Sequence, residues 1–129
     1  YFDKILLESF EYMGEGNTVY EGLVKKFMFI QQEKLFFKAA FKSDEQNCLK
    51  EHDFKLILKF YTDKIESKLG KKIPDDLKFI LEMYCQGSIY MTVQWVLGRI
   101  KRTPEQMAKS LVDAMPMELS LVFKKLDLI

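Results

Sequence analysis

The only histidine of this chain, His52, is the first candidate for acid–base chemistry, because imidazole titrates near neutral pH. It stands between Glu51 and Asp53, near the expected start of a helix, and Cys48 precedes it by four residues. A cysteine and a histidine can form a nucleophile and its base, but no nucleophile motif places these two side chains beside each other. We interpret His52 as a solvated surface residue and expect no catalytic residue in the chain.

The other polar residues predict neither a metal site nor a cofactor site. Cys48 and Cys85 are far apart, without a CxxC spacing or companion histidines, so they indicate neither a disulfide framework nor a zinc site. Acidic residues stand next to lysines on exposed helix faces instead of forming a catalytic pair, and no glycine-rich phosphate loop is present. We therefore expect no enzyme, no bound metal and no cofactor.

Length and charge narrow the remaining possibilities. A chain of 129 residues with 48% hydrophobic side chains can bury one core, so we expect residues 1–129 to form a single domain. The 20 Lys and Arg nearly balance the 19 Asp and Glu, which argues against a nucleic-acid surface. The basic runs are short and separated, and we interpret them as solvated helix ends: Lys25–Lys26, Lys71–Lys72, 99–102 and Lys124–Lys125.

The most apolar stretch, residues 77–100, does not predict a membrane span. Polar residues interrupt it, among them Lys78, Glu82 and Arg99, and a bilayer would accept these only at high cost. Because no secretory signal is visible, we expect a cytoplasmic protein with reduced cysteines. The chain begins at Tyr1 in a segment that already has a helical pattern, so we expect it to be part of a longer protein.

Helix signals run through the whole chain, whereas the alternating pattern of strands is absent, so the predicted fold class is all-α. Thr18 with Glu21, and Thr103 with Gln106, have the spacing of capping boxes, and Gly70 is placed to end a helix. Residues 43–47 form a polar connection of uncertain type. We expect a bundle of six to seven helices, at about 1–13, 18–32, 33–41, 51–69, 74–101, 104–115 and 117–126.

The long helix predicted at 74–101 has apolar residues on two faces, whereas a surface helix needs only one. Such a helix is either central to its own bundle or shared with a second subunit. Gly87 favours a helix shared with a second subunit. A mid-helix glycine costs about 1 kcal/mol relative to alanine, and close approach of another helix backbone would explain why that cost is accepted. One face reads Leu77, Leu81, Tyr84, Ser88, Met91 and Trp95, and the other reads Phe79, Met83, Gly87, Tyr90, Val93, Leu97 and Ile100.

Two segments carry a family pattern. Gly87 is followed by the run 93–97 (VQWVL) and then by 103–107 (TPEQM), and the segment 36–47 is an aromatic helix that ends in Gln-Asn. Together they resemble the C-terminal domain of TetR-family transcription regulators, particularly the branch of dihydroxyacetone kinase operon regulators. In this chain Glu45 stands where that branch tends to have glycine, and residues 48–50 replace its usual Ser-Phe pair.

The resemblance implies a regulator that binds operator DNA only through an N-terminal helix-turn-helix domain, which precedes the chain and is absent from it. It also implies a TetR C-terminal-like bundle that forms a homodimer through its last two long helices and answers to an unknown small-molecule or protein effector. No membrane partner is implied. The dimer interface would comprise Phe79, Met83, Gly87, Tyr90, Val93, Leu97, Met107 and Leu111.

Eleven Phe, six Tyr and seven Met exceed what a small core needs and suit an adaptable apolar cavity for the effector. The alternative is that these side chains simply fill the core, in which case the chain is a helical protein–protein interaction and dimerisation module without a small-molecule ligand. An enclosed cavity would distinguish the two. The pocket would be lined by Phe27, Phe37, Phe41, Phe54, Ile57, Tyr61, Tyr84 and Ser88.

Overall fold

The computed structural model describes residues 2–14, 18–42 and 46–128, and within these ranges the chain forms seven helices and no strand. The predicted all-α fold class is thereby confirmed. In chain order the helices are α1 (Phe2–Gly14), α2 (Val19–Gln32), α3 (Lys34–Lys42), α4 (Gln46–Leu69), α5 (Asp75–Val96), α6 (Pro104–Asp113) and α7 (Met117–Lys125).

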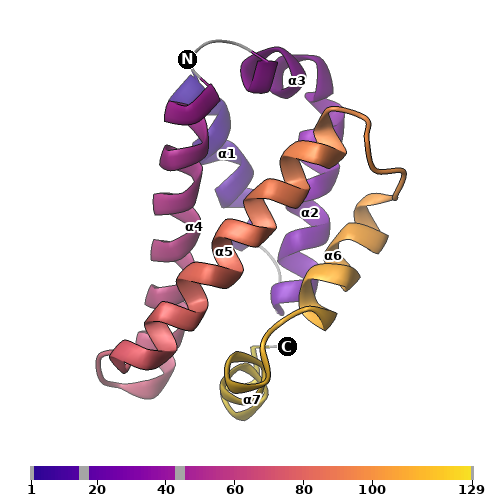
Figure 1. Cartoon of the computed structure of the whole chain (residues 1–129). Helices are drawn as coiled ribbons and strands as arrows, with labels where there is room; N and C mark the ends of the chain where they lie inside the picture. The colour runs from indigo at the N-terminus through magenta and orange to yellow at the C-terminus, as the bar shows by residue number, and fades with distance from the viewer. Residues whose placement is uncertain (1, 15–17, 43–45, 129) are drawn as a thin grey trace.

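Helix α5 crosses the front of the bundle in Figure 1, with α4 on one side and α6 on the other. Behind it, α2 packs most extensively against α1 and α6, while α7 closes the lower end. A backbone hydrogen bond of 2.8 Å from the amide of Val19 to the carbonyl of Leu128 joins the start of α2 to the chain beyond α7. No helix covers α5 from the front in this view.

Local signals set most helix ends as predicted. At the start of α6 both capping-box bonds form: Gln106 N donates to Thr103 Oγ1 (3.1 Å), and Thr103 N donates to Gln106 Oε1 (3.0 Å). At the start of α2 the Thr18 hydroxyl accepts from Glu21 N at 3.2 Å. Gly70 follows α4 with φ of 73°, a conformation that glycine adopts without steric cost.

The long helix predicted at 74–101 ends earlier, at Val96, and the reason is Gly98. Its φ is 85°, and the amide of Arg99 donates back to the carbonyl of Gln94 at 2.9 Å, which closes the helix. Residues 97–103 therefore form a connection to α6 instead of a further turn of helix. The indole nitrogen of Trp95 holds this connection in place by donating to the carbonyl of Arg102 at 2.8 Å.

Helix α4 begins at Gln46, five residues before the start predicted at Glu51. Its first turn is Gln-Asn-Cys-Leu, in which Leu49 is the one described side chain that packs against the core cluster, so periodicity gave little sign of a helix there. Of the predicted polar connection, residues 43–45 lie outside the described residues. Within the described ranges, no helix is both long and apolar enough to cross a membrane.

Candidate functional site

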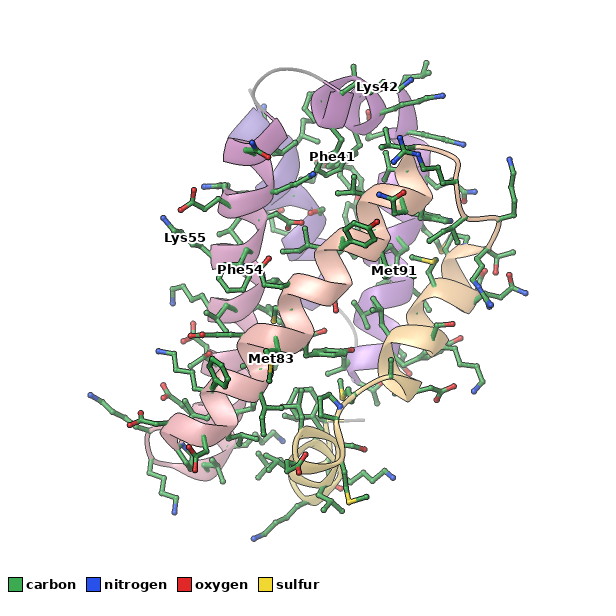
Figure 2. All side chains as sticks on the ribbon, in the orientation of Figure 1. Phe41, Lys42, Phe54, Lys55, Met83 and Met91 are labelled. Carbon is green, nitrogen blue, oxygen red and sulfur yellow. The ribbon has the colours of Figure 1, made fainter. Side chains whose placement is uncertain are left out.

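The residues predicted to line an effector pocket converge inside the bundle. All are buried except Phe54, which is half-buried, and all but Ser88 belong to or pack against one core cluster. Their rings contact one another: the centroids of Phe37 and Phe41 are 6.3 Å apart, and those of Tyr61 and Tyr84 are also 6.3 Å apart. In Figure 2, Phe41 lies beneath α3 and Phe54 beside α4. The aromatic residues therefore form a packed core in this structure.

Two of the polar residues predicted to line that pocket, Tyr84 and Ser88, form hydrogen bonds within the protomer. The Tyr84 hydroxyl donates to the carbonyl of Leu111, which ties α5 to α6, and Ser88 Oγ donates to the carbonyl of Tyr84 at 2.9 Å. Burial is the largest cause that raises the pKa values of both Tyr61 and Tyr84 above the usual tyrosine value. Both phenols are therefore neutral hydrogen-bonding groups at physiological pH.

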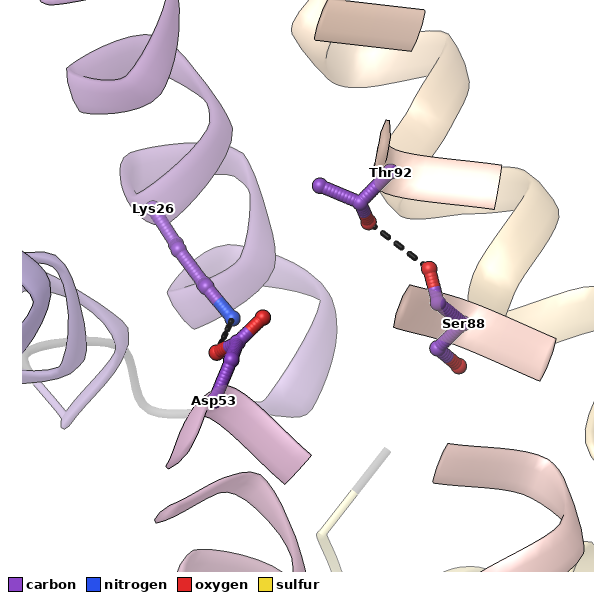
Figure 3. A network of polar contacts seen from close by, with 4 residues as sticks. All are labelled: Lys26, Asp53, Ser88 and Thr92. Carbon is purple, nitrogen blue, oxygen red and sulfur yellow. Dashed lines mark hydrogen bonds and ion pairs between the residues drawn. The ribbon is translucent and has the colours of Figure 1, made fainter. Parts of the chain in front are cut away.

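A buried ion pair between α2 and α4 lies in the same region. Lys26 and Asp53 are only 4% and 5% exposed, and Lys26 Nζ lies 4.0 Å from Asp53 Oδ1. Figure 3 shows the two side chains meeting between their helices, with Ser88 and Thr92 of α5 across from them. Charged groups are rarely buried this deeply, because removing them from water costs several kcal/mol per ion.

Cys85 of α5 lies near this ion pair, and Ser88 and Thr92 follow it one and two turns later on the same helix. Burial is the main reason that the pKa of the Cys85 thiol is raised to about 12. The nearby charges of Lys26 and Asp53 lower and raise this pKa, respectively. Thr92 Oγ1 donates to the carbonyl of Ser88 at 2.8 Å. Each hydroxyl donates its hydrogen to a backbone carbonyl of α5. The oxygens of Ser88 and Thr92 can therefore act only as hydrogen-bond acceptors towards other groups.

Asp53 is incompletely satisfied in this setting. Its Oδ1 atom is buried and accepts no hydrogen bond from any described residue, and the distance to Lys26 Nζ is at the upper limit for an ion pair. Burial raises the pKa of Asp53, and the charges of Lys26 and His52 oppose this rise. We call the group of Lys26, Asp53, Ser88 and Thr92 the polar centre; it can accept and donate hydrogen bonds within an apolar shell.

The raised pKa of Asp53 predicts a pH dependence of stability. A carboxyl whose folded pKa exceeds its unfolded value contributes stability at low pH, and that contribution is lost as the pH rises through the window above the ordinary value of 3.8. The stability advantage of the wild type over Asp53→Asn should therefore shrink as the pH is raised from about 4 towards 7. Urea unfolding of both proteins at several pH values measures this, and an advantage that grows with pH would contradict it.

Sequence reasoning missed Lys26 and Asp53, which were interpreted as a solvated helix end and as a neighbour of a surface histidine. Helical spacing could have identified both residues as buried, because each shares a helix face with core residues. Lys26 falls between Leu23 and Ile30 on the inner face of α2, and Asp53 precedes Ile57 by four residues on α4. His52 itself is half-buried, and the Cys48 side chain lies outside the described residues. The described residues bring together no group of three or more metal-ligating side chains.

The residues predicted to form a dimer interface divide into two groups. Phe79, Met83, Gly87 and Tyr90 form an exposed stripe on α5, with 62%, 56% and 63% of Phe79, Met83 and Tyr90 accessible. Figure 2 shows Met83 on the face of α5 that no helix covers. Leu97 and Leu111 are half-buried, whereas Val93 and Met107 are buried in the protomer core and are therefore not part of an exposed face.

The exposure of Gly87 bears on its role in the helix. A Cβ atom built on this glycine would meet nothing within 4 Å, so no close approach inside the protomer requires a glycine there. Val93 is a member of the core cluster, and Met107 is buried because the inner face of α6 packs on α2. The exposed stripe is thus narrower than the sequence predicted.

A family model of the TetR type, described as the transcriptional regulator C-terminal region, matches residues 17–116. The chain belongs to this TetR-type family. No curated protein and no solved structure matches the chain significantly. The matched range runs from the start of α2 to the end of α6, so it includes both the polar centre and the exposed stripe of this TetR-type regulatory domain. The resemblance inferred from the sequence is confirmed at the level of the family.

Proposed function

We propose that the chain is the effector-sensing and homodimerisation domain of a TetR-type transcription regulator, of the branch similar to the dihydroxyacetone kinase operon regulators. An N-terminal helix-turn-helix domain would read the operator, and this domain would control how two such heads are spaced. The observation that carries the proposal is the exposed apolar stripe of α5, in a chain whose family consists of regulator C-terminal regions.

The stripe has the properties of an interface between two copies. Phe79, Met83, Gly87 and Tyr90 follow one another at steps of four, four and three residues, so they line a single face of α5. A contiguous exposed apolar patch of this kind marks an association site more often than isolated apolar residues do. Glycine in its middle lets a second helix approach closely. A twofold axis through the stripe would pair α5 with its copy, and α6 and the half-buried Leu111 would flank the contact.

The polar centre supports effector binding at the position predicted for the pocket. A small hydroxylated compound would supply a donor to the unsatisfied Oδ1 of Asp53 and would accept from Lys26, while the oxygens of Ser88 and Thr92 accept from its other hydroxyls. The surrounding aromatic side chains, among them Phe27 and Tyr61, would supply contact area. Binding there requires these rings to separate from their packed arrangement.

Helix α5 would link the two activities, because it carries Ser88 and Thr92 on its inner side and the stripe on its outer side. A shift of α5 on effector binding would change the angle between the two copies. Helix α1 packs against α2 and α4, so it would carry the same movement towards the DNA-reading heads.

Light scattering of the purified chain at micromolar concentration tests the proposal, and we expect twice the mass of one chain. An obligate interface of this type buries upwards of about 2,000 Å², and its subunits rarely exist as stable folded monomers, so we expect the dimer to persist at that concentration. A monomer across the micromolar range would contradict the proposal.

The second candidate function, an interaction module without a small-molecule ligand, is favoured by the ring contacts between Tyr61 and Tyr84 and between Phe37 and Phe41. Thermal unfolding in the presence of a panel of small hydroxylated compounds separates the two candidates. A ligand that binds only the folded state raises the unfolding temperature in proportion to the logarithm of its concentration. A sensor would respond to at least one such compound, whereas an interaction module would respond to none.

A further inference from the structure

A second region of the molecule has the features of a binding site. A cavity of about 310 Å³, partly open to solvent, lies where the end of α2, the end of α5 and the start of α6 meet. It shares no lining residue with the predicted effector pocket or with the polar centre. Its volume is at the lower end of the range of about 300–1,000 Å³ that small-molecule sites occupy, so it fits one small ligand.

The floor of this cavity is apolar and fixed in position. Ile30 from α2 and Trp95 and Val96 from α5 are all buried and belong to the main core cluster, and Ile100 packs against that cluster. The Trp95 ring lies edge-on to Phe27 at 5.4 Å, and its indole nitrogen is bonded to the carbonyl of Arg102. A hydrocarbon group of a ligand would therefore meet a rigid apolar surface.

The rim of the cavity is cationic. Lys34, Lys101 and Arg102 line it and are exposed, and among the described residues none of the three has an ion-pair partner. The described residues that line the cavity include no aspartate or glutamate. The carbonyl end of α5 does not offset this charge, because amides of Gly98 and Arg99 already cap it. The remaining polar side chains at the rim are neutral: Gln31, Thr103 and Gln106.

We propose that this cavity binds a small organic anion with an apolar tail, of the class of medium-chain carboxylates. The tail would lie on Trp95 and Ile100, and the carboxylate would lie at the rim beside Lys101 and Arg102 or Lys34. An apolar floor with a cationic rim matches an amphipathic anion, whereas a neutral alcohol of the same length would use the floor alone. This site is separate from the effector site of the proposed function and does not depend on it.

Trp95 makes the test direct, because it is the only tryptophan of the chain and lines the cavity. Octanoate titrated into the wild-type protein should change the Trp95 emission with saturation, and 1-octanol should bind several-fold more weakly. A unit charge about 4 Å away contributes roughly fivefold in affinity in water, so Lys101→Gln with Arg102→Gln should weaken octanoate binding about 25-fold. The same pair of changes should leave octanol binding unaltered.

The matched control removes two charges elsewhere. Lys71→Gln with Lys72→Gln alters exposed lysines in the connection between α4 and α5, so it makes the same change in net charge and should leave octanoate affinity within about twofold. The proposal is overturned if octanoate does not saturate the Trp95 signal, if octanol binds as tightly, or if both double variants behave alike. Light scattering reports the dimer separately, so failure of this site is distinguishable from failure of the proposed function.

Discussion

Replacing Gly87 by leucine is expected to turn the proposed dimer into a monomer while leaving the fold of one chain intact. Beyond the backbone of α5 itself, no atom of the described residues lies within 4 Å of a Cβ at this position, and Gly87 is exposed, so the new side chain can extend into solvent in a single chain. Leucine also favours helix over glycine by about 0.8–1 kcal/mol, which should stabilise α5 slightly. In a dimer, however, the same side chain would hold the two copies of α5 apart.

Phe79→Glu provides an independent version of this experiment at one end of the stripe. It would bury a charge in the apolar contact, and a large aromatic residue in an interface contributes up to about 2–4 kcal/mol, which corresponds to a dissociation constant raised roughly 30-fold to 1,000-fold. Leu35→Glu is the control, because Leu35 is 85% exposed on α3, away from the stripe. It makes the same type of change and should leave the dimer intact.

Sedimentation equilibrium of the three variants and the wild type measures these effects, and circular dichroism confirms that each chain remains helical. If Gly87→Leu and Phe79→Glu dissociate no more readily than Leu35→Glu, the dimer does not use the stripe. The interface would then have to lie on another exposed apolar surface, such as Met117 and Leu121 on α7.

The helices could be predicted from the sequence because their determinants are local. The hydroxyl of Thr103 and the side chain of Gln106 act within one turn, and the glycine at 70 needs no distant partner. Gly98 is the exception that shortened α5. It was taken as part of a helix because apolar residues continue beyond it to Ile100, whereas its left-handed backbone ends the helix.

The sites were only partly predictable, because they depend on how helices meet. The aromatic residues around Tyr61 were expected to be close together, and they are, but their sequence could not show whether a void lies between them. The cavity beside Trp95 combines residues near 30, 95 and 103, and no local pattern links these positions. Lys26 was misplaced because its neighbour Lys25 suggested a solvated pair, although its helical position is on the inner face.

The buried pair of Lys26 and Asp53 leads to the largest expected change in stability. Removing the Lys26 charge leaves the buried carboxyl of Asp53 without the cation that lies 4.0 Å from it, and breaking a buried pair in this way typically costs about 3–5 kcal/mol. Lys26→Met should lower the melting temperature by roughly 10–20 °C for a chain of this size, at a fixed protein concentration. Asp53→Asn should lower it less, because burial raises the pKa of Asp53 and so already disfavours its charged form. Lys26→Met with Asp53→Asn contains no buried charge at this site, so it should recover most of the loss and remain dimeric.

The surface pair of Lys59 and Asp63 on α4 is the matched comparison. Its atoms are closer, at 2.7 Å, but the two side chains are 73% and 60% exposed. Water already solvates both charges, so an exposed pair one helical turn apart contributes only about 0.3–0.5 kcal/mol. The losses of unfolding free energy in Lys59→Met and Asp63→Asn should therefore nearly add up to the loss in the double variant.

Double-mutant cycles of both pairs, measured by urea unfolding, therefore decide what the buried charges do. A large coupling at Lys26 and Asp53, with little at Lys59 and Asp63, means that burial and not proximity sets the interaction. If the uncharged double variant is as stable and as dimeric as the wild type, the fold does not require the ion pair, which is then free to serve the proposed effector binding. That variant should then no longer be stabilised by any hydroxylated compound that stabilises the wild type. Additive losses from the two single variants would show instead that Lys26 and Asp53 do not act as one unit.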